Sequence, residues 1–134
     1  MKDWAWFDES FVLAVHDEQI REHGGLDGLR DRGLLASALA KPQQLAAYGA
    51  PDAADLASAY AFGVARNHPF LDGNKRTAFV LAETFLNLNG YVLPATDEDC
   101  YLTMIRLAAG ELTQEEFAAW VRNNMARIED QKNL

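Results

Sequence analysis

The sequence predicts an all-α protein in which a bundle of helices surrounds one central, buried helix. Apolar side chains recur at helical spacing through most of the chain, and helix caps and stops fall between these stretches. Alternation of apolar and polar residues, the pattern of a half-buried strand, never persists for long. With 134 residues, of which 49% are hydrophobic, the chain is expected to form a single domain, residues 1–134, that buries roughly two-thirds of its unfolded surface.

Three helices are expected in the first half of the chain. Asp8 can cap a first helix that runs to about His23, where two glycines end it. A short second helix that contains Leu34 and its apolar neighbours is expected to stop at Pro42, because proline interrupts helical hydrogen bonding. Asp52, which follows another proline, opens the third helix.

The second half begins with a helix that is apolar on almost every side, which marks it as the central, buried helix. Its apolar residues are Ala78, Phe79, Val80, Leu81, Ala82, Phe85, Leu86 and Leu88. Gly90 ends this helix, and Thr96 starts the next one, with Cys100 among its inward-facing residues. A last helix follows a capping box formed by Thr113 and Glu116, in which each side chain binds the backbone of the other residue.

Charge and composition exclude several classes of function. The chain has a formal net charge of −8 and a pI of about 4.7, which argues against a nucleic-acid binder, because such a protein needs a basic face. The acidic amino terminus has no apolar core of a signal peptide, and no apolar run is long enough to span a membrane. The single cysteine, Cys100, cannot form an internal disulfide and is expected in the core. We therefore expect a cytoplasmic protein without a membrane or nucleic-acid partner.

A polar cluster separates the third helix from the central one. It reads His68-Pro69-Phe70-Leu71-Asp72-Gly73-Asn74-Lys75-Arg76-Thr77-Ala78. The cluster leads directly into the amino terminus of a helix, where the first backbone N–H groups lack partners inside the helix and the macrodipole is positive. Such a place binds anions, and the pattern favours a site for phosphate groups.

His68 is the candidate general base of this cluster. Pro69 disfavours the α conformation for the residue before it, so His68 is expected to be extended at the mouth of the loop. Phe70 and Leu71 can bury beside the core and hold the loop in place. An unperturbed imidazole titrates near pH ~6.5, which would let a histidine here accept a proton from a hydroxyl at cellular pH.

The remaining residue types of the cluster suit a nucleotide. Asp72 is a hard oxygen ligand of the kind that Mg²⁺ takes beside nucleotide phosphates. Gly73 allows a tight turn, and Asn74 suits a turn or a helix cap. Lys75 and Arg76 supply positive charge for phosphate oxygens. Residue types alone leave another interpretation open, an ordinary turn and helix cap with two solvated cations, and it is the order of the residues that favours the phosphate site.

This order resembles the loop of the Fic/Doc superfamily, which reads His-x-Phe-x-Asp/Glu-Gly-Asn-x-Arg. Lysine in the variable slot, here Lys75, is the pattern of its death-on-curing (Doc) branch, whose members are toxins of toxin–antitoxin systems. The similarity continues upstream through residues 24–31 and 33–42, and downstream through residues 89–91. The resemblance covers about residues 11–121, nearly the whole chain, and implies the helical fold of that family.

The resemblance also implies roles for the residues of the loop. His68 matches the general base that takes the proton from a target hydroxyl, and Asp72 matches the Mg²⁺ ligand. The residues that match the phosphate-binding turn and its further phosphate contacts are Gly73, Asn74, Lys75 and Arg76. ATP is the substrate that these roles imply.

Two positions distinguish the activities known in the family. Members that transfer AMP have glycine in place of Lys75 and a second arginine in place of Phe79. This chain therefore resembles the Doc branch, in which the γ-phosphate lies toward the base and a protein hydroxyl is phosphorylated, with elongation factor Tu as the known kind of target. Transfer of AMP to a protein hydroxyl remains an alternative, and so does a non-catalytic binding module that retains the fold.

Two further expectations rest on the resemblance. The segment from Gln43 to Ala50 would form a flap beside the site that binds the backbone of the target, although the residues alone are as consistent with an ordinary surface connection. Self-inhibited members carry a Ser/Thr-x-x-x-Glu-Gly/Asn helix, and this sequence contains no such string. Control by a small antitoxin partner is therefore expected.

Overall fold

The computed structural model describes residues 3–131, and this part of the chain contains seven helices and two short strands. In chain order they are α1 (Glu9–His23), α2 (Arg32–Tyr48), α3 (Ala53–Asn67), α4 (Asn74–Leu88), β1 (Tyr91–Val92), α5 (Asp97–Ala108), α6 (Gln114–Asn124), β2 (Ala126–Arg127) and α7 (Ile128–Gln131). The two strands pair antiparallel, with Tyr91 opposite Arg127. The prediction of an all-α fold is confirmed.

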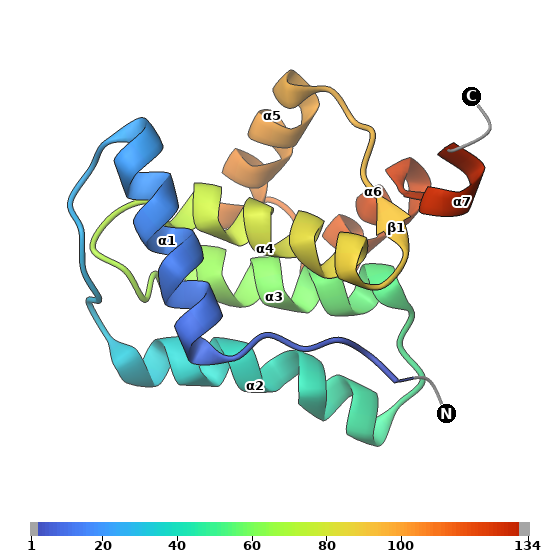
Figure 1. Ribbon diagram of the computed structural model, residues 1–134, viewed down its shortest axis with the longest axis horizontal. Coiled ribbons are helices and arrows are strands. Elements are labelled where there is room, and N and C mark those ends of the chain that lie inside the picture. The colour runs from blue at the N-terminus through green and yellow to red at the C-terminus, as the bar shows by residue number, and fades with distance from the viewer. Residues whose placement is uncertain (1–2, 132–134) are drawn as a thin grey trace.

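The centre of the bundle is formed by α3 and α4. They lie side by side in Figure 1, with α2 running along α3 and α1 crossing α4. Burial extends along nearly all of α3, over residues 53–65, and the buried face of α4 includes Leu81 and Phe85. Gly63 allows α2 and α3 to approach closely, because a Cβ atom there would lie 2.9 Å from the Cβ of Ala38. The predicted bundle around a buried helix is present, and α3 is more deeply buried than α4 within it.

Most helix ends agree with the prediction. The carboxylate of Asp8 accepts the N–H of Phe11 at the start of α1, and α1 ends at His23, immediately before Gly24. The side chains that cap the other predicted starts are Asp52 for α3, Thr96 for α5 and Thr113 for α6. These ends are local features, set by residues within one turn of each other.

The second helix is longer than predicted. Because α2 continues through Pro42 to Tyr48, the prediction that it stops at Pro42 is wrong. Pro42 is buried together with Leu35 and Leu39 on the face of α2 that packs on the core. This burial of apolar surface offsets the backbone hydrogen bond that proline cannot make.

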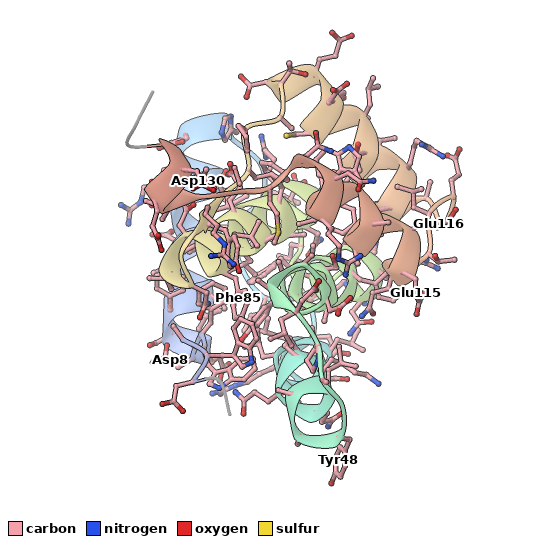
Figure 2. All side chains as sticks on the ribbon, turned by 90° about the vertical axis from the view of Figure 1, so that its right-hand side faces the viewer. Asp8, Tyr48, Phe85, Glu115, Glu116 and Asp130 are labelled. Atoms are coloured by element: carbon pink, nitrogen blue, oxygen red, sulfur yellow. The ribbon has the colours of Figure 1, made fainter. Side chains whose placement is uncertain are left out.

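The segment from Gln43 to Ala50 is not a flap beside the loop that joins α3 to α4. Residues 43–48 form the end of α2. Figure 1 shows this end of α2 and the α3–α4 loop at opposite sides of the molecule. Tyr48 projects from the end of the helix, with 90% of its surface exposed (Figure 2). The expectation of a flap at this position is therefore wrong.

The amino-terminal segment packs against the end of α4 opposite the α3–α4 loop. The rings of Trp4 and Trp6 each lie 6.0 Å from the ring of Phe85, measured between centroids. The backbone N–H of Ala5 donates to the side-chain oxygen of Asn89 at 3.0 Å. Within residues 3–131, no helix is long and apolar enough to cross a membrane.

Candidate active site

The predicted site lies where α3 gives way to α4, at the left of Figure 1. His68 forms the C-cap of α3, and its backbone N–H donates to the carbonyl of Val64 at 3.2 Å. The backbone of His68 has φ 50° and ψ 57°, so the prediction of an extended His68 is wrong. Pro69 disfavours the right-handed helical conformation at His68, as predicted. Because α3 continues up to Asn67, His68 ends the helix in the left-handed conformation and is not extended.

The segment between α1 and α2 runs beside this loop. The backbone N–H groups of Arg30 and Asp31 both donate to the carbonyl of Pro69, at 2.7 and 3.0 Å. The N–H of Leu71 donates to the carbonyl of Gly28 at 3.0 Å. Backbone pairing between distant segments therefore fixes the path of the loop.

Phe70 anchors the loop in the core, as predicted, whereas Leu71 does not. Phe70 is 1% exposed, and its ring stacks on the ring of His16 with the centroids 3.8 Å apart. Leu71 is 52% exposed, because successive residues of an extended stretch point to opposite sides. Nε2 of the buried His16 donates to the carbonyl oxygen of Asp72 at 2.8 Å, so α1 also holds the end of the loop.

The side chain of Asn74 closes the loop from within. Its Oδ1 accepts the N–H of Phe70 at 3.0 Å, and its Nδ2 donates to the carbonyl of Phe70, also at 3.0 Å. Nδ2 lies 3.5 Å from Nδ1 of His68, which is the longest of these contacts. The buried side-chain amide of Asn74 therefore binds the backbone of the loop. The backbone of Asn74 forms the first residue of α4.

The helix that follows begins without a side-chain cap. Its N-cap is Gly73, with φ 76°, and no acidic residue lies in its first turn. In the described part of the chain, α1, α2, α3, α5 and α6 each follow an aspartate or threonine whose side chain accepts a backbone N–H. At α4 no carboxylate or hydroxyl takes that place, and Lys75 and Arg76 add positive charge to the first turn.

Asp72 carries an exposed carboxylate that is held at the turn. Oδ1 accepts the N–H of Gly73 at 2.9 Å, and Oδ2 accepts the N–H of Leu26 at 3.3 Å. These two hydrogen bonds, that from Gly73 above all, hold the pKa of Asp72 below its ordinary value, and the charges of Arg76 and Lys75 act in the same direction. The carboxylate is therefore ionised at neutral pH and retains lone pairs for a cation.

This donor set suits a magnesium ion that arrives with phosphates. Mg²⁺ usually keeps several waters and is bound through one or two carboxylates together with the phosphates of a substrate. Asp72 provides one such carboxylate at the turn. Within residues 3–131, no group of three or more histidine, cysteine, aspartate or glutamate side chains could hold a metal ion. Among the described residues of the cavity, Asp72 is therefore the one that could hold an ion that phosphates also bind.

The predicted residues converge on one cavity of about 360 Å³. Its lining residues are His68, Leu71, Asp72, Gly73, Asn74, Lys75, Arg76 and Tyr101. A neighbouring groove between α1, α4 and α5, of about 340 Å³, shares Lys75, Arg76 and Tyr101 with this cavity. His68 is exposed, so its imidazole can meet a molecule that enters the cavity.

Comparison with known families shows which family the chain belongs to. The sequence model described as Fic/DOC family matches residues 6–86. The chain belongs to this family. It is similar to the protein kinase Doc of Escherichia phage P1, with 34% identity over 112 residues, which are 83% of this chain and 88% of the relative. It is also similar to the toxin Doc of Mycolicibacterium smegmatis, with 48% identity over 75 residues, 54% of this chain and 57% of the relative. The predicted membership of the Doc branch is confirmed.

Sequence reasoning did not find two residues that hold the Fic/DOC loop of this chain. Arg30 donates through its guanidinium to the carbonyls of Asn67 and His68, and His16 donates to the carbonyl of Asp72. Arg30 lies inside the upstream stretch that resembles the family, but nothing local marks it as a contact of the loop. Both residues reach the loop through space, from other helices and turns.

Proposed function

We propose that this chain is a Doc-type toxin that transfers the γ-phosphoryl group of ATP to a hydroxyl side chain of a protein of the elongation factor Tu type, and so stops translation. The observation that carries this proposal is the shared cavity, in which an uncapped helix start with Lys75 and Arg76 faces the same space as the exposed His68. Such an arrangement binds a polyphosphate beside a base. The relative from phage P1, which is 34% identical, is a protein kinase by name.

Phosphoryl transfer asks a protein for positioning and charge neutralisation more than for covalent work. Nε2 of His68 accepts the proton of the target hydroxyl while the hydroxyl oxygen forms its bond to the γ-phosphorus. The bond from the γ-phosphorus to the oxygen that bridges to the β-phosphate breaks, and ADP leaves with that electron pair. Nε2 accepts this proton when the proton of the neutral ring is on Nδ1. The donor Nδ2 of Asn74 lies 3.5 Å from Nδ1, which is too long to hold the ring in the opposite tautomer.

The triphosphate would lie along the start of α4. Backbone N–H groups there and the side chains of Lys75 and Arg76 would bind its oxygens, with the planar guanidinium suited to two of them at once. The Nη2 of Arg76 donates to the carbonyl of Gly24 at 3.1 Å, which holds the side chain near the cavity. Asp72 would hold a Mg²⁺ ion, which when bound neutralises charge on the phosphate oxygens.

Positions 75 and 79 favour phosphoryl transfer over AMP transfer. Lys75 and Phe79 both line the groove beside the cavity. A lysine leaves less room at the start of α4 than the glycine of AMP-transferring members, and a phenyl ring cannot bind a γ-phosphate as their second arginine does. We therefore place the γ-phosphate toward His68 in this proposal.

The proposal includes control by a small antitoxin. The relative from Mycolicibacterium smegmatis is a toxin by name, and this sequence contains no Ser/Thr-x-x-x-Glu-Gly/Asn string for self-inhibition. We expect expression of the chain alone to arrest growth, and coexpression with the product of a neighbouring small gene to relieve the arrest. Arrest that no such product relieves would contradict the antitoxin and leave the phosphoryl transfer standing.

ATP labelled at one phosphate tests the reaction. The chain is incubated with Mg²⁺, with cell extract or purified elongation factor Tu, and with ATP labelled at either the γ- or the α-phosphate. We expect protein to be labelled from the γ-phosphate alone. Label from the α-phosphate would show AMP transfer, and no label from either would show a binding module. His68→Ala should reduce the transfer by about 10²–10⁴-fold.

A further inference from the structure

Three consecutive backbone carbonyls around the proposed base are bound by one short segment. The guanidinium of Arg30 donates from Nη2 to the carbonyl of Asn67 at 2.8 Å and from Nε to the carbonyl of His68 at 2.6 Å. The backbone N–H groups of Arg30 and Asp31 donate to the carbonyl of Pro69 at 2.7 and 3.0 Å. Arg30 therefore contacts the chain immediately before, at and after His68.

The backbone conformation that these contacts hold is an unfavourable one. Within residues 3–131, His68 is the one residue other than glycine with a positive φ. A left-handed backbone brings Cβ close to the carbonyl oxygen, and residues with a side chain rarely adopt it. Such a conformation persists only where the surrounding structure holds it. The guanidinium binds two carbonyls at this carboxyl end of α3, where the helix dipole also favours a positive charge.

The side chain of Arg30 neither packs in the core nor lines the cavity. It is exposed, so it does not fill space between helices. Among the described residues, the cations that line the cavity are Lys75 and Arg76, and Arg30 is not one of them. The hydrogen bonds that join Arg30 to the site therefore run to the backbone of His68 and of its two neighbours in the chain.

We infer that Arg30 is a positioning residue for the transfer reaction: it fixes the left-handed backbone of His68 and so presents the imidazole to the phosphate cavity. This inference rests on the proposed function, in which His68 accepts the proton of the target hydroxyl. Because the phosphates bind at the start of α4, loss of Arg30 misplaces the base and leaves the nucleotide in place. Loss of Arg30 should therefore lower kcat and leave the KM for ATP unchanged.

Kinetics of two substitutions test this role. Arg30→Met keeps the aliphatic part of the side chain and removes both donors. We expect kcat to fall about tenfold to a hundredfold, as for a misplaced catalytic group, and the KM for ATP to change by less than about twofold. Arg30→Lys, which retains one charged donor, should recover part of the lost kcat. A raised KM with unchanged kcat would overturn the inference, since Arg30 would then be a contact of the nucleotide.

A matched control distinguishes the specific effect of losing Arg30 from the general effect of losing an arginine nearby. Arg32 begins α2 and pairs with Glu9, from Nε to Oε1 at 2.9 Å. Arg32→Met should therefore keep the wild-type kcat and KM. Thermal unfolding of all three variants shows that each is folded at the assay temperature. If Arg32→Met lowers kcat as much as Arg30→Met does, the inference fails.

The double variant asks whether Arg30 acts through His68. In a His68→Ala background, Arg30→Met should not lower the residual rate any further, because the residue that Arg30 positions is no longer there. An equal loss in both backgrounds would overturn the inference, since the arginine would then act on its own.

Imidazole NMR separates failure of this inference from failure of the proposed function. The chain has three histidines, and the ring signals of His68 are those absent from His68→Ala. These signals should shift or broaden in Arg30→Met and remain unchanged in Arg32→Met. If the wild-type chain transfers no phosphate, the proposed function fails, and the signals still decide the positioning role. His68 signals that are the same with and without Arg30 would overturn it.

Discussion

The helices α3 and α4 lie side by side (Figure 1). They differ in whether side chains bind the backbone N–H groups of their first turns. At α3, Asp52 accepts the N–H of Asp55 at 2.8 Å, and Asp55 accepts the N–H of Asp52 at 3.0 Å. At α4, Gly73 offers no side chain, and Arg76 stands at the position equivalent to Asp55. One helix therefore caps itself with negative charge, whereas its neighbour presents free donors and positive charge to a cavity.

The two helix starts also differ in what holds them in place. The cap of α3 is made by residues three apart in the sequence, and Arg122 binds both of its aspartates at 2.7 and 2.9 Å. The start of α4 is held by neighbours, since His16 donates to the carbonyl of Asp72 and Asn74 binds the backbone of Phe70. If the first N–H groups of a helix are left free for a ligand, no side-chain cap binds them. Other parts of the fold must then hold the start of that helix in place.

Giving α4 the charge pattern of α3 should have the largest effect. Arg76→Glu places an acid at the third position of the helix, where Asp55 stands in α3. We expect transfer and the binding of Mg²⁺-ATP to fall by at least about a hundredfold, because the cation proposed to bind phosphate becomes a repelling anion. The free energy of unfolding should change little, since an acid in the first turn stabilises a helix by about 0.3–1 kcal/mol, which offsets the lost hydrogen bond from Arg76 to the carbonyl of Gly24. Calorimetric titration with ATP and unfolding in urea measure the two effects separately.

Arg76→Lys is the control for this substitution. It retains the positive charge and loses the planar pair of donors, so it should fall between wild type and Arg76→Glu. Normal binding of Mg²⁺-ATP by Arg76→Glu would contradict a phosphate site at this helix start. An unfolded Arg76→Glu would show instead that the hydrogen bond from Arg76 to the carbonyl of Gly24 is needed for the fold.

Removing the outside support of α4 should loosen the site without reversing its charge. His16→Phe keeps a ring stacked on Phe70 and removes the donor to the carbonyl of Asp72. A hydrogen bond of this kind contributes about 0.5–1.5 kcal/mol, so we expect the Kd for Mg²⁺-ATP to rise about threefold to tenfold. His16→Gln, whose amide nitrogen reaches the place of Nε2, should recover most of the affinity. Equal loss in both variants would show that the stacked ring matters and the donor does not.

The features that could be predicted from the sequence are local ones. A capping residue and the N–H that it binds are three positions apart, so residue type and spacing predict the cap directly. The residues for which this worked are Asp8, Asp52, Thr96 and Thr113. That the candidate base, acid and cations line one cavity could be predicted for the same reason, since they lie within one short stretch from His68 to Arg76.

The features that could not be predicted depend on packing between distant parts of the chain. His16 and Arg30 contact the loop from 56 and 38 positions away. The continuation of α2 through Pro42 depends on burial of a face that only the assembled bundle defines. The left-handed backbone of His68 depends on how far α3 extends and on what binds its last carbonyls. In each case the rule for a short stretch was overridden by the tertiary structure.

Removing the cap of α3 should lower stability and leave the transfer unchanged. Asp52 precedes α3 and His68 follows it, so the two residues lie at opposite ends of the helix. Asp52→Ala should lower the free energy of unfolding by about 0.5–2 kcal/mol, the usual effect of a lost N-cap. Urea unfolding and the phosphate-transfer assay, run on the same preparation, measure both quantities. Loss of transfer in the folded variant would contradict the separation between the two helix starts.

The smallest effect should be a dependence of the α3 cap on acid. The hydrogen bond from the guanidinium of Arg122 lowers the pKa of Asp52 from 3.8 to about 2. A carboxylate whose pKa is lower in the folded state than in the unfolded state stabilises the fold above its unfolded pKa. That contribution is lost as the pH falls through its folded pKa. For Asp52 the stabilisation should therefore be complete above about pH 4 and decline toward about pH 2.

Asp52→Asn isolates this contribution, because asparagine is as good an N-cap as aspartate and carries no charge. The side chains of Asp52 and Arg122 are 47% and 43% exposed, so solvent weakens their attraction. We expect wild type to exceed Asp52→Asn in the free energy of unfolding by no more than about 1 kcal/mol at neutral pH. Urea unfolding of both proteins at a series of acid pH values should show this advantage shrinking below about pH 4. An advantage that stays constant or grows in acid would mean that the ionised pair with Arg122 does not stabilise the start of α3, and that its hydrogen-bonded cap alone does.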